Sequence, residues 1–446
     1  MFKTEHIREM LQHKEYDSIA LILKDYHPVD IAEIINELSD DEKVQLFKTL
    51  EFTQAVEVLE ELDTYDKYIL LSNINISYAV KLISEMSTDE VADFFGELDN
   101  EKKVKFLSLL KKQTQIDIKE ILAYDKDSAG GRMTTEFIAF PKDMKAGEVI
   151  DKLGELSVDA ETIYYVYVVD SDNKLVGVVS LRDLILAPAD TAIEEFMWVD
   201  VKKVLVTEDQ EEVAKLMKKY GLLALPVVDD DNELLGIVTV DDVFTVVEEE
   251  ATEDMLKFAG STELETPEIL KTSLWFRTKR RLPWILIAVV GEIISGSIIN
   301  NFSHALQAVV ALSFFIPVLM DMGGNVGTQS AAIAIRGLAT GEIKPSMLWK
   351  NIAREAMVGL ILGVSNGIII AIVAYLWKGN ATLGIVVGIA MTINLVLAAV
   401  LGSFIPLLWH KLGRDPAVAS GPLITTILDI LCIFIYFSTA VKFLTI

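Results

Sequence analysis

The sequence predicts a multidomain membrane protein: an all-α N-terminal helical domain, an α/β region with an internal duplication, a connecting helix, and an all-α domain of five membrane-spanning helices. Three observations predict it. Apolar residues recur at helical intervals over residues 1–125, two similar strand-turn-strand stretches lie 59 residues apart, and long apolar runs fill the chain from residue 283. We therefore expect domains at residues 1–125, 126–245, 246–282 and 283–446.

The negative charge is confined to the first part of the chain. Residues 283–446 contain eight Lys and Arg against six Asp and Glu, a net of +2, so the total of −26 leaves −28 for residues 1–282. Such a surface favours cations as ligands and argues against nucleic acid as a partner. The alternative, that acidity only keeps a large domain soluble, stays open. Cys432 is the single cysteine and the five histidines are scattered, so neither a disulfide, a zinc site nor a catalytic constellation is indicated.

The first 125 residues read as short helices joined by capped turns. Ser39 with Glu42, and Ser87 with Glu90, have the spacing of capping boxes. The stretches 31–51 and 91–112 repeat one helix-turn-helix pattern. Asp89 and Asp93 are one helical turn apart, so they repel each other unless a cation lies between them. A merely solvated face is the competing interpretation.

The duplication consists of VYVVDSDNKLVGVVSLRDL (166–184) and LPVVDDDNELLGIVTVDDV (225–243). Each copy predicts two strands and a helix capped by Ser180 or Thr239. With G-x-V-[ST]-x-x-D in both copies, this region resembles a tandem pair of CBS domains, at about 130–187 and 196–245. The resemblance implies adenine nucleotide binding, with Thr239 and Asp242 as candidate contacts and ATP as a candidate cofactor. That both residues serve only the cap and the fold stays an equal alternative.

The connecting region begins with an acid-rich helix, VVEEEATEDMLKFAG (246–260). Like charges at this density destabilise a helix, and divalent cations would relieve the repulsion. Basic residues at 277–281 then precede the first apolar run, as the positive-inside rule expects at a cytoplasmic surface.

Five spans are expected, at about 283–302, 305–335, 354–377, 381–409 and 416–443. The loops at 336–354 and 410–415 carry most of the basic residues and are therefore assigned to the cytoplasm, with the N-terminus inside and the C-terminus outside. Because five helices cannot form a two-fold repeat within one chain, a pore on the axis between two copies is the natural arrangement.

The last span contains one carboxylate near its middle, Asp429. Gly421, Thr425 and Asp429 share one helical stripe, and an intramembrane acid normally faces water or an ion. The second span contains PVLMDMGGNVGTQS (317–330), whose proline and glycines predict a broken helix with free carbonyls, including that of Gly324, and with Asn325 as an oxygen ligand suited to hydrated Mg²⁺. The alternatives are a buried structural Asp and a packing motif of small residues. Glu292 in the first span either lines a vestibule or pairs structurally.

With PVLMDMGGNVGTQSAAIAIRGLATGEI, DPAVASGPLITTILDILCIFIYFS and DSAGGRMT, essentially the whole chain resembles the MgtE family of magnesium channels. The resemblance implies a homodimeric, Mg²⁺-selective channel in the cell membrane, whose acidic cytosolic domains bind Mg²⁺ and close the pore. It implies that Asp429 is the pore carboxylate, and it implies regulatory metal ligands at Asp89, Asp93, Asp209, Glu211, Asp242, Glu250, Glu253 and Asp254. Gly221, Thr245 and Gly421 depart from the family pattern, which implies weaker sensing or fewer ions.

Two rival functions remain. A secondary transporter that exchanges Mg²⁺ or Co²⁺ for Na⁺ or H⁺ also uses an intramembrane acid and a broken helix. A membrane-anchored nucleotide sensor explains the CBS pair but gives Asp429 no purpose. The sequence leaves the ion preference among Mg²⁺, Mn²⁺, Co²⁺ and Ca²⁺ open.

Overall fold

The computed structural model describes residues 2–98, 100–108, 110, 112–156, 161–261, 274–344, 347–418 and 421–444. The chain forms two compact units, Met1–Glu248 and Glu249–Ile446. The first unit contains a helical stack and two three-stranded sheets, and the second contains long apolar helices. The predicted fold class is confirmed.

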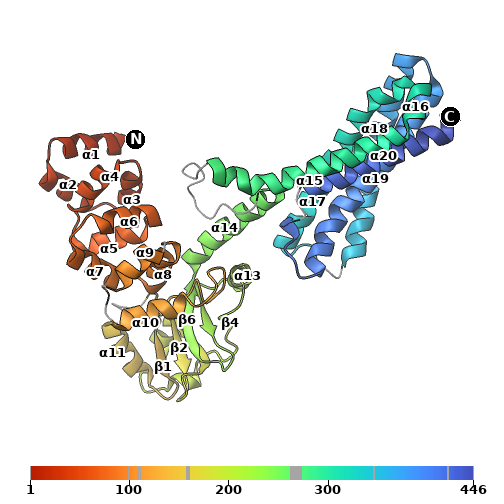
Figure 1. Ribbon diagram of the computed structural model, residues 1–446. Coiled ribbons are helices and arrows are strands. Elements are labelled where there is room, and N and C mark those ends of the chain that lie inside the picture. Colours follow the sequence, from red (N-terminus) through yellow and green to blue (C-terminus); the bar gives the residue numbers. More distant parts are fainter. Residues whose placement is uncertain are drawn as a thin grey trace. The chain divides into compact units, whose positions relative to one another are not determined.

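The N-terminal part is a stack of helical hairpins that follow one another in sequence order (Figure 1). Alternate helices begin 24 residues apart, because α3, α5, α7 and α9 start at residues 28, 52, 76 and 100, and α4, α6, α8 and α10 at 40, 64, 88 and 112. The bounds are α1 (Phe2–Gln12), α2 (Tyr16–Leu23), α3 (Pro28–Asn36), α4 (Asp40–Phe47), α5 (Phe52–Glu60), α6 (Thr64–Ser72), α7 (Ile76–Glu85), α8 (Thr88–Glu97), α9 (Asn100–Leu107) and α10 (Lys112–Ile121).

The same period governs the core of this stack. Leu46, Leu70 and Phe94 occupy equivalent positions and are all fully buried. The stretches 31–51 and 91–112 both fold as a helix-turn-helix, α3–α4 and α8–α9, so the expected repeat of this pattern is confirmed. Both helices of a hairpin carry the same apolar spacing, so the pattern alone does not distinguish the first helix from the second.

Successive hairpins are joined by ion pairs that involve buried lysines. Lys43 pairs with Asp66 and, 24 residues later, Lys67 pairs with Glu90. Glu90 is therefore not part of a capping box at the start of α8, and that prediction is wrong. The Ser39 capping box is confirmed, because the Ser39 backbone N–H donates to Glu42 Oε2 at 3.0 Å.

The two copies of the duplication fold alike. In the first, β1 (Ala139–Pro141) lies parallel to β2 (Tyr165–Val169), which is antiparallel to β3 (Leu175–Ser180), with α11 (Ala146–Leu156) and α12 (Leu181–Leu186) alongside. In the second, β4 (Val204–Leu205), β5 (Ala224–Val228) and β6 (Leu234–Thr239) pair in the same way, with α13 (Gln210–Tyr220) and α14 (Val240–Phe258). Asn173 and Asn232 occupy the same left-handed turn position, at φ 59° and 68°. The predicted duplication is confirmed.

The segment that leads into each copy lies against the sheet of the other copy. Thr134 forms a bridge with Ile237 of β6, and Trp198 forms one with Val178 of β3. A side chain at Gly236 would collide with Met133, as one at Gly177 would with Met197. Residues 128–134 are therefore fixed to the second copy, although the sequence places them before the first.

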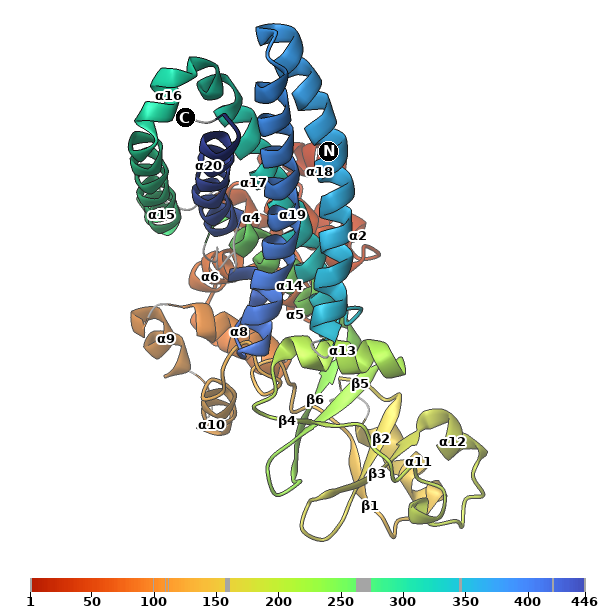
Figure 2. The same ribbon diagram turned by 90° about the vertical axis from the view of Figure 1, so that its right-hand side faces the viewer.

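The membrane unit contains five helices that are long and apolar enough to span a bilayer, as predicted. They are α15 (Leu274–Asn301), α17 (Ile316–Ala339, preceded by a 3-10 segment from Val310), α18 (Leu348–Lys378), α19 (Ala381–Lys411) and α20 (Gly421–Leu444); α16 (Ser303–Ala308) and the 3-10 turn Pro416–Val418 connect them. Figure 2 shows α18 and α19 lying side by side along their length. Gly359, Gly363 and Gly367 permit this close approach, and Thr392 Oγ1 donates to the Gly363 carbonyl at 3.0 Å.

The predicted break in the second span is wrong. The α17 helix begins at Ile316, with Pro317 in its first turn, and continues through Gly323, Gly324 and Gly327. Because no water reaches a backbone buried among apolar helices, keeping the helical hydrogen bonds costs less than freeing the carbonyls. The glycines instead admit neighbouring helices, since Gly327 touches the backbone of Gly402. The small-residue packing interpretation is therefore the correct one for this segment.

Candidate functional site

The predicted pore residues lie where α17 faces α20. A Cβ on Gly324 would lie 3.3 Å from Thr425 Cγ2, so the two helices are in contact there. Thr425 and Asp429 are half-buried on α20, whereas Gly421 is buried at its start. On α17, Asn325 is exposed and its Nδ2 donates to Asp321 Oδ2 at 3.1 Å.

Two further acids belong to this region. Glu292 of α15 and Asp321 of α17 are both close enough to Asp429 to act on it electrostatically. Asp321 was missed, although it lies four residues before Asn325 in the same motif. Within the described residues, no group of three His, Cys, Asp or Glu side chains is close enough to hold a metal ion. One chain thus brings three carboxylates near each other without forming a closed, dehydrated metal site.

A second group of acids lies at the N-terminus of α8, and we call Asp89, Glu161 and Asp242 the α8 acidic cluster. Asp89 is half-buried, and its Oδ1, which is shielded from solvent, has no hydrogen-bond partner. Burial, followed by the charges of Asp242 and Glu161, raises the pKa of Asp89 well above its usual value. The surrounding protein, together with the charge of Asp242, also raises the pKa of Glu161 to about 7, although Glu161 itself is exposed. A cation near this orphaned oxygen would relieve the repulsion between the carboxylates, although the three described side chains are not close enough together to ligate one dehydrated ion directly.

The sequence gives Asp242 two candidate roles, as a nucleotide contact and as a regulatory metal ligand, and its surroundings favour the second. The Thr239 hydroxyl donates to Asp242 Oδ2, as a helix cap. Burial raises the pKa of Asp242, and the charges of Asp241 and Glu90 raise it further. A phosphate group would meet only repulsion from these acids, so the position suits a metal ion better than a nucleotide. Glu161 and Glu90 were missed because they are distant from Asp242 in sequence.

Asp93, the other acid on α8, has a different neighbour. Its Oδ2 lies 3.7 Å from Arg132 Nη1. Burial raises the pKa of Asp93 to about 6, and Arg132 opposes that shift. The expected pairing of Asp89 and Asp93 around one ion therefore gives way to two separate environments.

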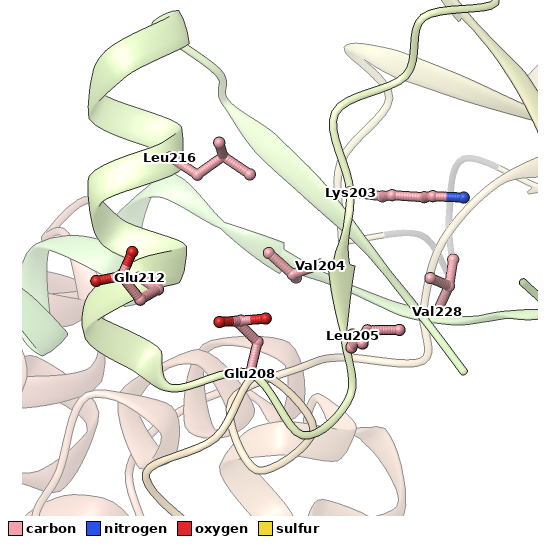
Figure 3. Close-up of a pocket in the computed structure, with 7 residues that line it drawn as sticks. All are labelled: Lys203, Val204, Leu205, Glu208, Glu212, Leu216 and Val228. Carbon is pink, nitrogen blue, oxygen red and sulfur yellow. The ribbon is translucent and has the colours of Figure 1, made fainter. Parts of the chain in front are cut away.

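Asp209 and Glu211 have local partners in the structure. Asp209 caps α13, because its Oδ1 accepts the Glu211 N–H at 2.8 Å. Glu211 forms an ion pair with Lys215 at 3.0 Å. Next to them is a shallow cavity of about 300 Å³, lined by Lys203, Val204, Leu205, Glu208, Glu212, Leu216 and Val228. Figure 3 shows Glu208 and Glu212 on its α13 side and Lys203 on the other, so a polyphosphate would again meet carboxylates.

The acids of α14 lie on the part of that helix that belongs to the membrane unit. Lys257 pairs with Glu253 and with Asp415, whose Oδ2 accepts its ammonium at 2.8 Å. Glu250 and Asp254 are half-buried on the same helix. Gly260 packs against Pro422 in the first turn of α20. The end of the connecting helix thus contacts the start of the helix that carries Asp429.

Family models match most of the chain. The intracellular N domain of MgtE matches residues 26–127, CBS domains match 129–190 and 193–249, and the divalent cation transporter model of MgtE matches 316–439. The CBS matches agree with the predicted pair.

Relatives compared over most of their length belong to the same family as the matching models. A magnesium transporter MgtE of Thermus thermophilus is 38% identical over 97% of both chains, and one of Bacillus subtilis is 40% identical over 80% of this chain and 78% of its own. These relatives are named as transporters and not as enzymes. A solved cytosolic domain of the Mg²⁺ channel MgtE in complex with ATP is 36% identical, covers 55% of this chain and 99% of its own, and gives a TM-score of 0.52. The chain therefore belongs to the MgtE family of divalent cation transporters.

Proposed function

We propose that this protein is a Mg²⁺-selective channel for magnesium uptake, which closes when cytosolic Mg²⁺ binds its acidic cytosolic part. The observation that carries the proposal is the position of Asp429. It lies on a span-length helix, one turn from Thr425 and the Gly324 contact, and close to two further carboxylates. Carboxylates gathered at membrane depth are costly unless a cation or water accompanies them.

Selectivity would come from the water that the ion keeps. Mg²⁺ loses water reluctantly, and the oxygens of Asp429, Thr425 and Asn325 can accept hydrogen bonds from its hydration shell. The absence of a close three-ligand group among the described residues fits such an outer-shell site. Entry needs no coupled reaction, because two charges moving through 100 mV gain about 4.6 kcal/mol.

The pore is proposed to form between two copies, each of which contributes one Asp429. The α15 helix exposes most of its apolar residues within one chain, including Ile285, Val290 and Ile293. Lipid and a second copy are the surfaces that can cover them. The cell membrane is the proposed location, with the N-terminus cytoplasmic and the C-terminus outside, an orientation that the loop charges favour.

Gating would follow from charge. Without Mg²⁺, the acids of the α8 acidic cluster repel, which opposes docking of α8 on the CBS pair. Bound Mg²⁺ removes that repulsion. The signal can reach the pore through α14, because Lys257 and Gly260 contact Asp415 and Pro422 beside the start of α20.

ATP is proposed as a ligand of the CBS pair, because a similar solved cytosolic domain is described in complex with it. The acids around Thr239 and Asp242 disfavour phosphate there. The equivalent position in the first copy is less acidic: the Ser180 hydroxyl donates to Asp183 Oδ2 at 2.7 Å, and the exposed Trp198 ring lies beside it. We therefore propose the first copy as the nucleotide position.

The test is Mg²⁺ entry into liposomes and single-channel recording for wild type, Asp429→Ala, and Glu342→Gln, which removes an exposed carboxylate of a loop. We expect unitary currents in wild type and E342Q, and lost or unselective conduction in D429A. Raising Mg²⁺ on the cytosolic side should close the wild-type channel. Selective conduction in D429A would refute the proposal.

The second candidate is a secondary exchanger of Mg²⁺ or Co²⁺ against Na⁺ or H⁺. The intramembrane acids Glu292 and Asp321 beside Asp429 favour it, because exchangers use such groups for the coupling ion. Mg²⁺ flux that requires an opposing Na⁺ or H⁺ gradient and shows no unitary current would establish this function instead.

A further inference from the structure

Arg132 places a positive charge at the contact between α8 and the CBS pair. Its Nη1 lies 3.7 Å from Asp93 Oδ2, and its side chain is 16% exposed against 51% for Asp93. Its Nε donates to Gln210 Oε1 at 2.9 Å, and Gln210 is buried at the start of α13. The guanidinium is therefore held on the CBS side of the contact, and the carboxylate comes from the helical stack.

The backbone around Arg132 is fixed tightly to the second CBS copy. Ala129 N–H donates to the Glu208 carbonyl at 2.7 Å, and Gly130 N–H donates to the Val206 carbonyl at 2.9 Å. A side chain on Gly130 would collide with Tyr124. Arg132 is thus presented by a rigid segment, which reduces the conformational entropy that an ion pair with α8 would cost.

The same face of α8 makes a second contact with the CBS pair, and this one is uncharged. Thr88 Oγ1 accepts the Thr135 N–H at 3.1 Å. Asp89, between Thr88 and Asp93, faces the other acids of the α8 acidic cluster and has an oxygen without a partner. The contact between α8 and the CBS pair therefore has two parts. Asp89 has no positive side chain beside it among the described residues, whereas Asp93 has Arg132.

We infer that Arg132 serves as a built-in cation at Asp93, so that α8 stays docked on the CBS pair in part without Mg²⁺, and Asp93 is not a metal ligand in this protein. The site at Asp93 does not fit a metal ion, because an arginine already lies against its carboxylate. This inference departs from the sequence prediction, which has Asp93 as a regulatory ligand. The inference sharpens the proposed regulation: Mg²⁺ acts at Asp89 on a contact that Arg132 keeps partly closed.

The test is amide hydrogen exchange of the full chain in detergent, in chelator and in millimolar Mg²⁺, read on the peptide that covers α8. Arg132→Gln removes the charge, and Lys152→Gln removes a charge from an exposed position of α11. In chelator, we expect exchange of α8 to become about threefold faster in R132Q than in wild type, since an ion pair with one half-exposed partner contributes about that factor. K152Q should match wild type. Mg²⁺ should restore protection in R132Q, because Asp93 is then free to bind it.

Equal exchange of α8 in R132Q and wild type in chelator would overturn the inference. The α5–α6 peptide reports whether R132Q remains folded. If that peptide also loosens, Asp93→Asn replaces R132Q, because it breaks the same pair at a half-exposed position; unchanged α8 exchange in D93N then overturns the inference. The chelator measurement contains no Mg²⁺, so a protein that fails to conduct would refute the proposed function and leave this result standing.

Discussion

Mg²⁺ binding at the α8 acidic cluster should release protons and become tighter as pH rises. The surrounding protein raises the pKa of Glu161 from 4.5 to about 7, so this group is mostly protonated at pH 6 and mostly ionised at pH 8. A metal ion binds only the ionised carboxylate, and for a pKa of about 7 the apparent Kd then falls about tenfold between those pH values. Asp89 shifts in the same direction and adds to the effect.

Without metal, the docking of α8 on the CBS pair has the opposite pH dependence: it weakens as pH rises. A carboxyl group whose pKa is higher in the folded state contributes its full stability below its unfolded pKa of about 4.5 and loses it as pH rises toward 7. In chelator, α8 should therefore dock more firmly at pH 5 than at pH 7.5. Mg²⁺ should reverse this loss.

Titration calorimetry of the full chain measures the affinity for Mg²⁺ and the number of protons released on binding. Mg²⁺ is added at pH 6, 7 and 8, each in two buffers with different ionisation enthalpies, so that released protons appear as a difference in heat. The double variant Asp89→Asn, Glu161→Gln should lose the pH dependence. Asp190→Asn removes a carboxylate whose side chain is 96% exposed and should keep it. Equal heats in both buffers, together with one affinity at all three pH values, would refute the reasoning.

Two other predictions concern the fold. Lys43→Met should lower the free energy of unfolding of the helical stack by about 3–5 kcal/mol, because Asp66, with a side chain 2% exposed, would stay buried without the positive charge of Lys43. Denaturant unfolding measures this loss, and adding Asp66→Leu should recover most of it. Gly402→Val should abolish the folded, monodisperse membrane unit seen by gel filtration, because its side chain would collide with the Gly327 carbonyl, whereas Gly296→Val, at a position with open space, should not. A monodisperse G402V protein would contradict the packing of α17 on α19.

The sequence predicted the elements whose patterns are local. The CBS copies were found because equivalent residues recur at a fixed distance, and Val168 with Gly177 indeed pairs as Val227 with Gly236 does. The spans were found because twenty apolar residues are needed to cross a bilayer. Asp429 was singled out because a charge is rare in such a run.

The misses have a common cause, since each depends on a neighbour distant in sequence. The glycines of 323–327 read as a helix break, but contacts with α19 and α20 keep them helical. Arg132 could not be assigned to Asp93, because nothing local shows that residues 128–134 cross to the second CBS copy. The 24-residue period of the stack is a separate case: the sequence pattern does not single it out, because both helices of each hairpin have similar apolar spacing.

That period has an evolutionary consequence. A stack built from equal units can gain or lose one at its free end while the geometry at α8 stays the same, because its main contacts join adjacent units. The match to the family's N domain begins at residue 26, after α1 and α2, which together form the first unit. This hairpin therefore serves as an end piece that covers apolar surface on the next unit, to which Arg8 also adds an ion pair with Glu42 at 3.7 Å.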